Sequence, residues 1–329
     1  MRIINPTGCK LARKSYDPKI AQLRFFASFS VVLYHLWTLQ ITIIPLFLLK
    51  FFRAGWLGVP LFLELSIFLL LNTLDNNSSL KRYFIRRIKR IWILYFPAVI
   101  TVFLADRYLL HINVTYYELA LHFVFLSFVL TPFSFKYLFW TLQLEEWMYL
   151  FIPLIHKASD RLKIYIAVSL ILVSFFYSLT IVFLPYNEFH TLYFMPPFWV
   201  GAYGYGIIAY VLNKRNKLKT NKSLILIAVL YFFYLYASFN LNGTNYQLFT
   251  RFFIYNPMLM ALALLILNPP RIIHKATVFL GEVSYGIYLW TLLFQELFGL
   301  AGVIYGILTA IATEFPLRRK EIIKRLKES

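Results

Sequence analysis

Apolar runs long enough to cross a lipid bilayer recur along this sequence, and they constrain its fold more than any other feature. The first of them covers residues 23–44. A helix needs about 20 mainly apolar residues to cross the hydrocarbon core. Charged residues are only 14% of the 329, whereas soluble domains carry about 25%. The sequence therefore predicts an all-α fold, a polytopic transmembrane helical bundle, which leaves no room for a large soluble domain.

About ten spans are expected. Their predicted bounds are 20–44, 56–74, 91–110, 138–156, 163–184, 191–212, 223–240, 249–268, 277–297 and 299–316. A further apolar run at 119–130 is too short to cross, so we expect one short re-entrant or interfacial segment there. The first run is longer than a signal-peptide core and lacks a small-residue cleavage site, so we expect it to remain as a span.

The distribution of Lys and Arg predicts the orientation of the bundle. With both termini cytoplasmic, 27 of the 33 fall in six inner segments: 1–19, 75–90, 157–163, 213–222, 269–276 and 318–329. This bias follows the positive-inside rule. Five cations fall towards the outside, namely Lys50, Arg53, Arg107, Lys136 and Arg251. The net charge of +19 then serves to orient the chain on anionic membrane lipids rather than to bind nucleic acid, and we expect a multi-pass protein of the cytoplasmic (inner) membrane.

Two ionisable residues share the first span. Arg24 and His35 are eleven residues apart, which is roughly 16 Å along a helix axis. Arg24 can remain at the basic face by snorkelling, whereas His35 then lies near mid-membrane. An ionisable group at that depth is a candidate functional group. The alternative is a neutral histidine that is hydrogen-bonded to a neighbouring helix.

Two further pairs of charged residues are candidates for the same site. Arg87 and Arg90 share one face if their segment is helical, and guanidinium groups bind phosphate; the alternative is a simple orienting anchor. Glu145 and Glu146 are adjacent, so they point about 100° apart in a helix and should not enter one cavity together. Glu145 could orient His35 or bind a sugar hydroxyl, or could instead be a structural partner of an arginine.

Other residues are assigned supporting roles or none. Glu64, Ser284, Tyr285 and Glu314 lie in apolar segments; Glu314 precedes Pro316 and is expected to pair with a cationic loop residue, whereas Tyr285 could equally be a packing residue. Cys9 is the one cysteine, so no disulfide within the chain is expected. No metal-ligand spacing or nucleotide-binding motif occurs, so we expect no metal site and no permanently bound cofactor.

Six blocks in order along the chain resemble the acyltransferase 3 family of integral membrane acyltransferases. They are Arg24-x10-His35, GVPLFLELSIFLL (58–70), Arg87-x-x-Arg90, WTLQLEEWMYL (140–150), LGEVSYGIYLW (280–290) and EFPLRR (314–319). Three positions depart from the family pattern: Pro60 replaces the usual Asp, Ile67 replaces Gly, and Thr291 replaces the His of many members. Glu64, four residues beyond Pro60, could offer a carboxylate nearby.

The resemblance implies that residues 1–329 form a single membrane-embedded acyltransferase domain, with 1–19 and 318–329 as cytoplasmic basic tails. Members of the family move an acyl group, usually acetyl, from cytoplasmic acyl-CoA to a hydroxyl, commonly on a cell-envelope or exported glycan. Arg24, Arg87 and Arg90 would then hold acetyl-CoA, and His35 would act as general base or carry a transient acyl group. Glu145 would orient His35 or the carbohydrate or glycolipid acceptor, with Glu146 in support.

Two rival hypotheses remain open from sequence. One is a transporter or flippase for a glycolipid or small anion, which predicts no coenzyme A binding and repeated broken helices. The other is an acyltransferase with a different acceptor, such as an antibiotic, a lipid or a protein amine.

Overall fold

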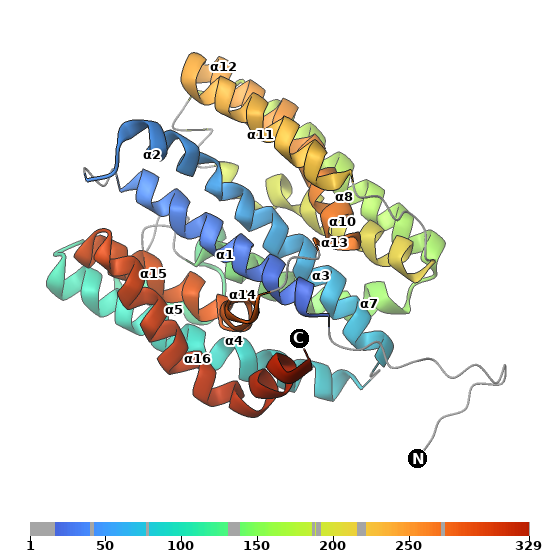
Figure 1. Cartoon of the computed structure of the whole chain (residues 1–329), viewed down its shortest axis with the longest axis horizontal. Helices are drawn as coiled ribbons and strands as arrows, with labels where there is room; N and C mark the ends of the chain where they lie inside the picture. The colour runs from blue at the N-terminus through green and yellow to red at the C-terminus, as the bar shows by residue number, and fades with distance from the viewer. Residues whose placement is uncertain are drawn as a thin grey trace.

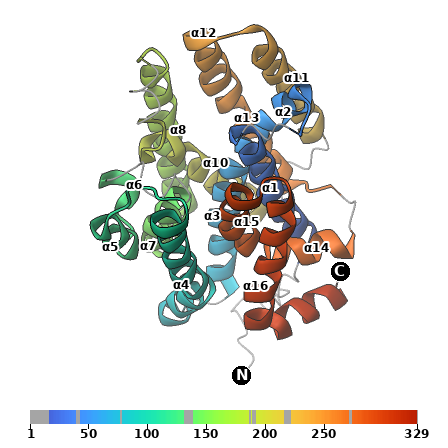
Figure 2. The same cartoon turned by 90° about the vertical axis from the view of Figure 1, so that its left-hand side faces the viewer.

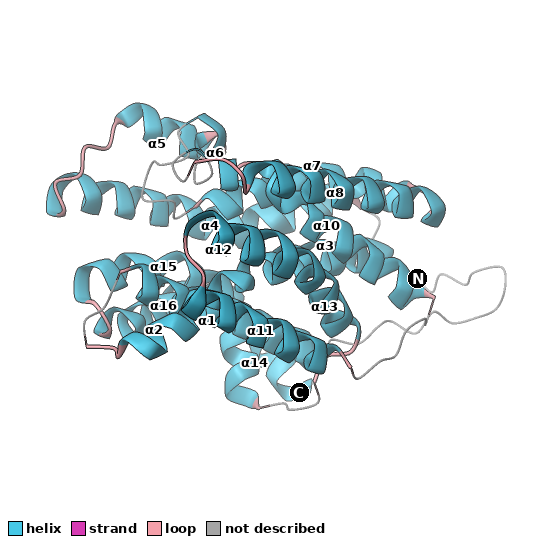
Figure 3. Cartoon of the chain, turned by 90° about the horizontal axis from the view of Figure 1, so that it is seen from above, coloured by secondary structure: helices cyan, strands magenta, loops and turns pink. Residues whose placement is uncertain are grey.

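The computed structural model describes residues 17–39, 43–76, 79–130, 139–185, 188, 192–215, 222–270 and 274–328, and every regular element in these ranges is helical (Figure 3). The helices are α1 (Pro18–Thr38), α2 (Leu46–Phe52), η1 (Arg53–Leu57), α3 (Gly58–Asn76), α4 (Leu80–Leu104), η2 (Ala105–Leu109), α5 (Tyr116–Phe123), α6 (Ser127–Leu130), α7 (Trp140–Lys157), α8 (Asp160–Ile181), α10 (Pro196–Lys214), α11 (Ser223–Asn240), α12 (Gly243–Leu248), η4 (Phe249–Ile254), α13 (Tyr255–Leu267), α14 (Lys275–Glu282), α15 (Ser284–Phe298) and α16 (Ala301–Glu328). The predicted all-α class is confirmed.

Five helical segments among the described residues are long and apolar enough to cross a membrane. They are Leu46–Asp75, Leu80–Leu109, Asp160–Ile181, Ser223–Asn240 and Gly243–Leu267. The pair α14–α15, which is bent by 76° at its break, makes a sixth if it forms one broken span. The protein is thus a helical membrane protein, whereas the count of ten crossings and the cytoplasmic position of both termini stay predictions.

Helix α1 runs through the middle of the bundle beside α3 (Figure 1) and packs also against α14 and α15. Asp17 caps its first turn by accepting a hydrogen bond from the Lys19 amide at 3.0 Å, and Pro18 occupies the first helical position, where it is tolerated. Gly281 of α14 lies directly on α1, because a Cβ there would be 1.8 Å from the Ala21 carbonyl oxygen. Only glycine allows this approach of the two backbones.

Two predicted boundaries differ from the structure, the first because its local signal was charge rather than a helix cap. The basic stretch 81–90 belongs to α4, whose first turn is capped by Ser79, so the predicted span at 91–110 begins well inside a longer helix. The predicted span at 277–297 is broken at Val283, between α14 and α15.

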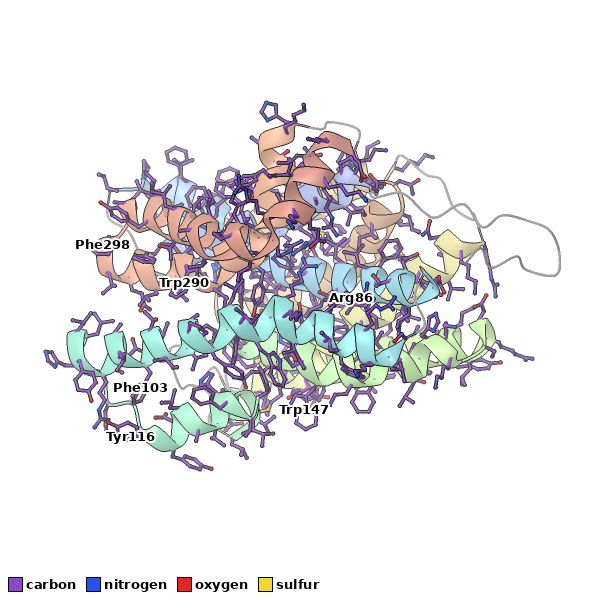
Figure 4. The ribbon with its side chains drawn as sticks, turned by 90° about the horizontal axis from the view of Figure 1, so that it is seen from below. Arg86, Phe103, Tyr116, Trp147, Trp290 and Phe298 are labelled. Carbon is purple, nitrogen blue, oxygen red and sulfur yellow. The ribbon has the colours of Figure 1, made fainter. Side chains whose placement is uncertain are left out.

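The segment expected to be re-entrant forms two short helices, α5 and α6, that lie with α4 and α7 to one side of α1 (Figure 2). Between them Phe125 adopts a positive φ of 56°. The rings of Phe103 on α4 and Tyr116 on α5 meet 5.4 Å apart (Figure 4), while Gln143 of α7 donates to Ser127 at 2.6 Å. Neither helix is long enough to cross a bilayer, in agreement with the prediction.

Candidate active site

A cavity of about 1170 Å³ lies between α1, α3, α4, α7, the α14–α15 bend and the end of α16. Its wall includes five of the residues singled out from the sequence: Arg24, Arg87, Arg90, Glu145 and Tyr285. Arg24 comes from α1 and the other two arginines from α4, so helices far apart in sequence converge on one basic chamber.

The cations of this chamber differ in their protein partners: Lys324 pairs with Glu328, and Arg325 pairs with Glu282. Within the described residues, neither Arg24 nor Arg90 makes a hydrogen bond or a close ion pair, and the Arg87 guanidinium lies 5.7 Å from the centre of the Tyr149 ring. Arg86 lines the same wall and donates a hydrogen bond from its Nε to the Arg82 carbonyl oxygen at 3.2 Å. Guanidinium groups with unused donors, such as those of Arg24 and Arg90, suit phosphate or carboxylate groups.

Glu145 is the carboxylate that α7 presents to the chamber. Its side chain is largely buried, accepts a hydrogen bond from Ser66 at 3.3 Å and a shorter one from the Tyr149 hydroxyl. Glu146 turns away, as the helical angle between neighbours predicts, and accepts a hydrogen bond from Trp92 at 3.0 Å. The sequence analysis did not find Ser66 or Tyr149, although Tyr149 lies one helical turn beyond Glu145.

His35 does not line the chamber. It shares a face of α1 with Arg24, and Ser28 and Val31, both buried, lie between the two on that face. The His35 ring packs edge-on against Tyr34, 5.6 Å away. The structure therefore does not bring His35 into contact with Glu145 or with the arginines of the chamber.

On α1 the residues that line the chamber end at Arg24, and the residues beyond it pack against α3. Val59 of α3 lines the chamber wall, and the adjacent Gly58 lies on α1, where a Cβ would be 2.2 Å from the Ala27 carbonyl oxygen and 3.0 Å from Val31. Val31 precedes His35 by four residues, or roughly 6 Å of helix. A layer of packed side chains therefore separates the chamber from the imidazole.

Glu314 has a structural role, as its expected pairing with a cation predicted. It accepts a hydrogen bond from Arg318 at 2.9 Å and another from the Gly286 amide at 2.8 Å, so it caps the start of α15 at the α14–α15 bend. Arg318 also reaches Glu282 at 2.8 Å, and Arg325 reaches the same carboxylate at 2.6 Å. Glu282 and Arg325 line the chamber, so this network builds one of its walls.

Neighbouring charges also shift the pKa values of Glu321 and Arg318 in this network. Burial alone raises the pKa of Glu321, but the neighbouring Arg318 and Arg325 outweigh it and hold the pKa below its ordinary value. Burial alone would lower the pKa of Arg318, but the carboxylates of Glu314, Glu321 and Glu282 raise it above its ordinary value.

The remaining two predicted residues lie outside the chamber. Glu64 is fully buried on α3, and neither of its carboxylate oxygens has a hydrogen-bond partner among the described residues; its backbone lies against Gly206 of α10. The Ser284 hydroxyl is buried and also lacks a hydrogen-bond partner in the part of the chain that the structure describes. Nothing in their positions connects them to the arginines.

Comparison with known proteins agrees with the resemblance of the motifs. The profile of an acyltransferase family, described as "Acyltransferase domain", matches residues 17–316, which include all the helices lining the chamber except the last turns of α16. The chain belongs to this acyltransferase family and is therefore an enzyme, not the transporter or flippase that was the first rival hypothesis.

One relative is similar over nearly the whole chain. It is a protein of Acidianus two-tailed virus described as "Putative acetyltransferase ORF330", 60% identical over 318 residues, which are 96% of this chain and 94% of the viral protein. No solved structure gives a significant match.

Proposed function

We propose that this acyltransferase is an O-acetyltransferase that moves an acetyl group from acetyl-CoA to a hydroxyl of a cell-envelope or exported carbohydrate. The observation that carries the proposal is the basic chamber, where Arg24 and Arg90 face a cavity of about 1170 Å³ without a close ion pair among the described residues. The acetyltransferase description of the viral relative supports acetyl as the transferred group.

Coenzyme A suits the arginines of this chamber in charge and the cavity in size. It is a long molecule that carries phosphates at one end and a thioester at the other, and planar guanidinium groups bind phosphate oxygens in pairs. The chamber exceeds the range of about 300–1,000 Å³ that is typical for drug-sized ligands. We assign Arg24, Arg87 and Arg90 to the phosphates, which leaves the thioester to extend towards Glu145.

The reaction is an attack of the acceptor hydroxyl oxygen on the thioester carbonyl carbon. A new C–O bond forms, the C–S bond breaks, and the hydroxyl proton passes to a base while coenzyme A leaves as a thiolate that is then protonated. His35 is the proposed base because neutral imidazole accepts a proton readily near neutral pH. This assignment requires the packed layer at Ser28 and Val31 to open during turnover, so that the thioester and the imidazole can meet.

The test uses the full-length protein in lipid nanodiscs, with His35→Ala and Glu145→Gln compared with the unaltered chain. Binding of coenzyme A is measured separately from transfer of radiolabelled acetyl to extracted envelope glycan. We expect both variants to bind coenzyme A normally, His35→Ala to lose transfer by about 100-fold or more, and Glu145→Gln to be impaired less. Undiminished transfer by a folded His35→Ala variant would remove His35 from the mechanism.

The donor site is tested with neighbouring cations of α4. Arg90→Gln should weaken coenzyme A binding by about tenfold, because a charge-assisted hydrogen bond contributes roughly 1.5–3 kcal/mol. Lys89→Gln is the matched control, because Lys89 is the adjacent residue, is exposed, and is not part of the chamber wall. Equal binding by the two variants would place the coenzyme A phosphates elsewhere.

A further inference from the structure

Two of the five cations that the charge bias leaves on the outer side meet in a group of aromatic rings. We define this arginine–aromatic cluster as Arg53 and Arg251 with Trp37, Trp56, Tyr193, Tyr234 and Tyr246. Trp37 lies thirteen residues beyond Arg24 on α1, or roughly 20 Å along the axis, so the cluster and the basic chamber are at opposite ends of that helix.

Arg251 is packed between rings rather than paired with a carboxylate. Its guanidinium lies 4.0 Å from the centre of the Trp56 ring and 4.6 Å from that of Tyr193, whose hydroxyl accepts a hydrogen bond from it at 3.0 Å. The residue is carried by η4, a π-helical turn between α12 and α13. Such turns are rare and occur frequently at functional sites.

Arg53 extends the cluster to the end of α1. Its guanidinium is 3.7 Å from the centre of the Tyr246 ring and 5.0 Å from that of Trp37. The Trp37 ring lies 5.4 Å from Tyr34, which in turn packs against His35. A continuous set of ring contacts therefore connects both arginines with the proposed catalytic base, on the side away from the coenzyme A chamber.

Among the described residues the cluster has positive charge without a matching negative group. Neither Arg53 nor Arg251 forms an ion pair there, and Arg251 donates a hydrogen bond to the Tyr193 hydroxyl. Aromatic faces stabilise a cation by about 2 kcal/mol or less when partly exposed, and they leave most of the guanidinium N–H donors unused. Such donors bind carboxylate or phosphate in a bidentate manner.

We propose that the arginine–aromatic cluster binds the acceptor, and that the acceptor is an anionic carbohydrate. The partly exposed ring of Trp37 suits the C–H face of a sugar ring. The buried rings of Trp56 and Tyr246 hold the guanidinium groups of Arg251 and Arg53 in place, and these two arginines bind an acidic substituent of the sugar. This inference rests on the proposed function, because it supplies the hydroxyl that His35 deprotonates. The donor and the acceptor thus approach the imidazole from opposite ends of α1.

The test compares two disaccharides that differ in one group. Cellobiouronic acid carries a carboxylate where cellobiose carries a hydroxymethyl group, and inorganic phosphate tests an anion without a sugar. Binding of each to the full-length protein in nanodiscs is measured by isothermal titration calorimetry. We expect cellobiouronic acid to bind about tenfold more tightly than cellobiose or phosphate. Equal binding of the two disaccharides, no binding of either, or equal binding of phosphate would overturn the proposal.

Arg53→Gln and Arg251→Gln should each abolish the preference for the charged disaccharide and leave coenzyme A binding unchanged. Arg107→Gln is the matched control, because Arg107 also stacks on a tyrosine, Tyr116 at 4.9 Å, but lies outside the cluster. If Arg251→Gln fails to fold, Arg53→Gln decides. If the folded variants still prefer the charged disaccharide, the assignment of the acceptor to this cluster is wrong. If the unaltered protein does not bind coenzyme A, the proposed function is wrong instead.

Discussion

Replacing Arg318 by methionine should destabilise the protein strongly, because this side chain holds two buried carboxylates, Glu314 and Glu282, and the second of them lines the chamber. The Arg318 side chain is 10% exposed, Glu282 1% and Glu314 0%. Removing one partner of a buried ion pair costs about 3–5 kcal/mol. We expect the lower end, about 3 kcal/mol, because Arg325 still pairs with Glu282 and the Gly286 amide still donates to Glu314. Methionine keeps most of the aliphatic volume, so the loss reports the charge.

The assay is thermal unfolding of the full-length protein in one detergent, followed by tryptophan fluorescence. The entropy of unfolding is about 2.1 cal/mol/K per residue, so a chain of 329 residues loses about 1.4 °C per kcal/mol. The midpoint should therefore fall by about 4 °C. Arg319→Met is the matched control, because Arg319 is the next residue and is exposed; its effect should stay within about 0.5 kcal/mol. Equal midpoints for the two variants would refute the reasoning that the Arg318 network supports the wall.

Two further predictions concern the same end of the bundle. Gly281→Ala places a methyl group 1.8 Å from the Ala21 carbonyl oxygen, so α14 must move away from α1; we expect a loss of about 1–3 kcal/mol in detergent unfolding together with weaker coenzyme A binding, and unchanged behaviour would contradict this helix contact. The lowered pKa of Glu321 predicts a stabilising contribution that is present above its unfolded-state pKa of about 4.3 and is lost as the pH falls through the lower folded-state value. Unfolding midpoints measured from about pH 6 to about pH 3 should therefore drop less steeply in Glu321→Gln, and identical acid profiles would count against the effect.

Helical spacing predicted several details of the chamber correctly. The three-residue interval between Arg87 and Arg90 and the angle between Glu145 and Glu146 are properties of one helix, and both agree with the structure, where Glu145 alone of the two acids lines the chamber. The axial distance from Arg24 to His35 also follows from the geometry of one helix. Whether the space between these two residues is open depends on how Val31 packs against α3, which the sequence of α1 alone cannot specify.

The basic stretch at 81–90 shows where local signals misled. Its charges predict a cytoplasmic loop, yet Ser79 caps a helix there and α4 continues through it. The charge of a segment indicates which side of a membrane it prefers, but its secondary structure is set by capping and by the packing of the helix. Burial of Tyr83 within this stretch is an example of such packing.

The sequence by itself determined the all-helical membrane fold, the uneven distribution of cations and the acyltransferase family, because the lengths of apolar runs, helical periodicity and short motifs are properties of neighbouring residues. Only the tertiary structure decided that Arg318 holds Glu282 and Glu314, that His35 does not line the chamber, and that Arg53 and Arg251 gather around the same aromatic rings. These are contacts between helices that are distant along the chain. They depend on which faces pack together and on where small residues such as Gly58 and Gly281 let two backbones approach.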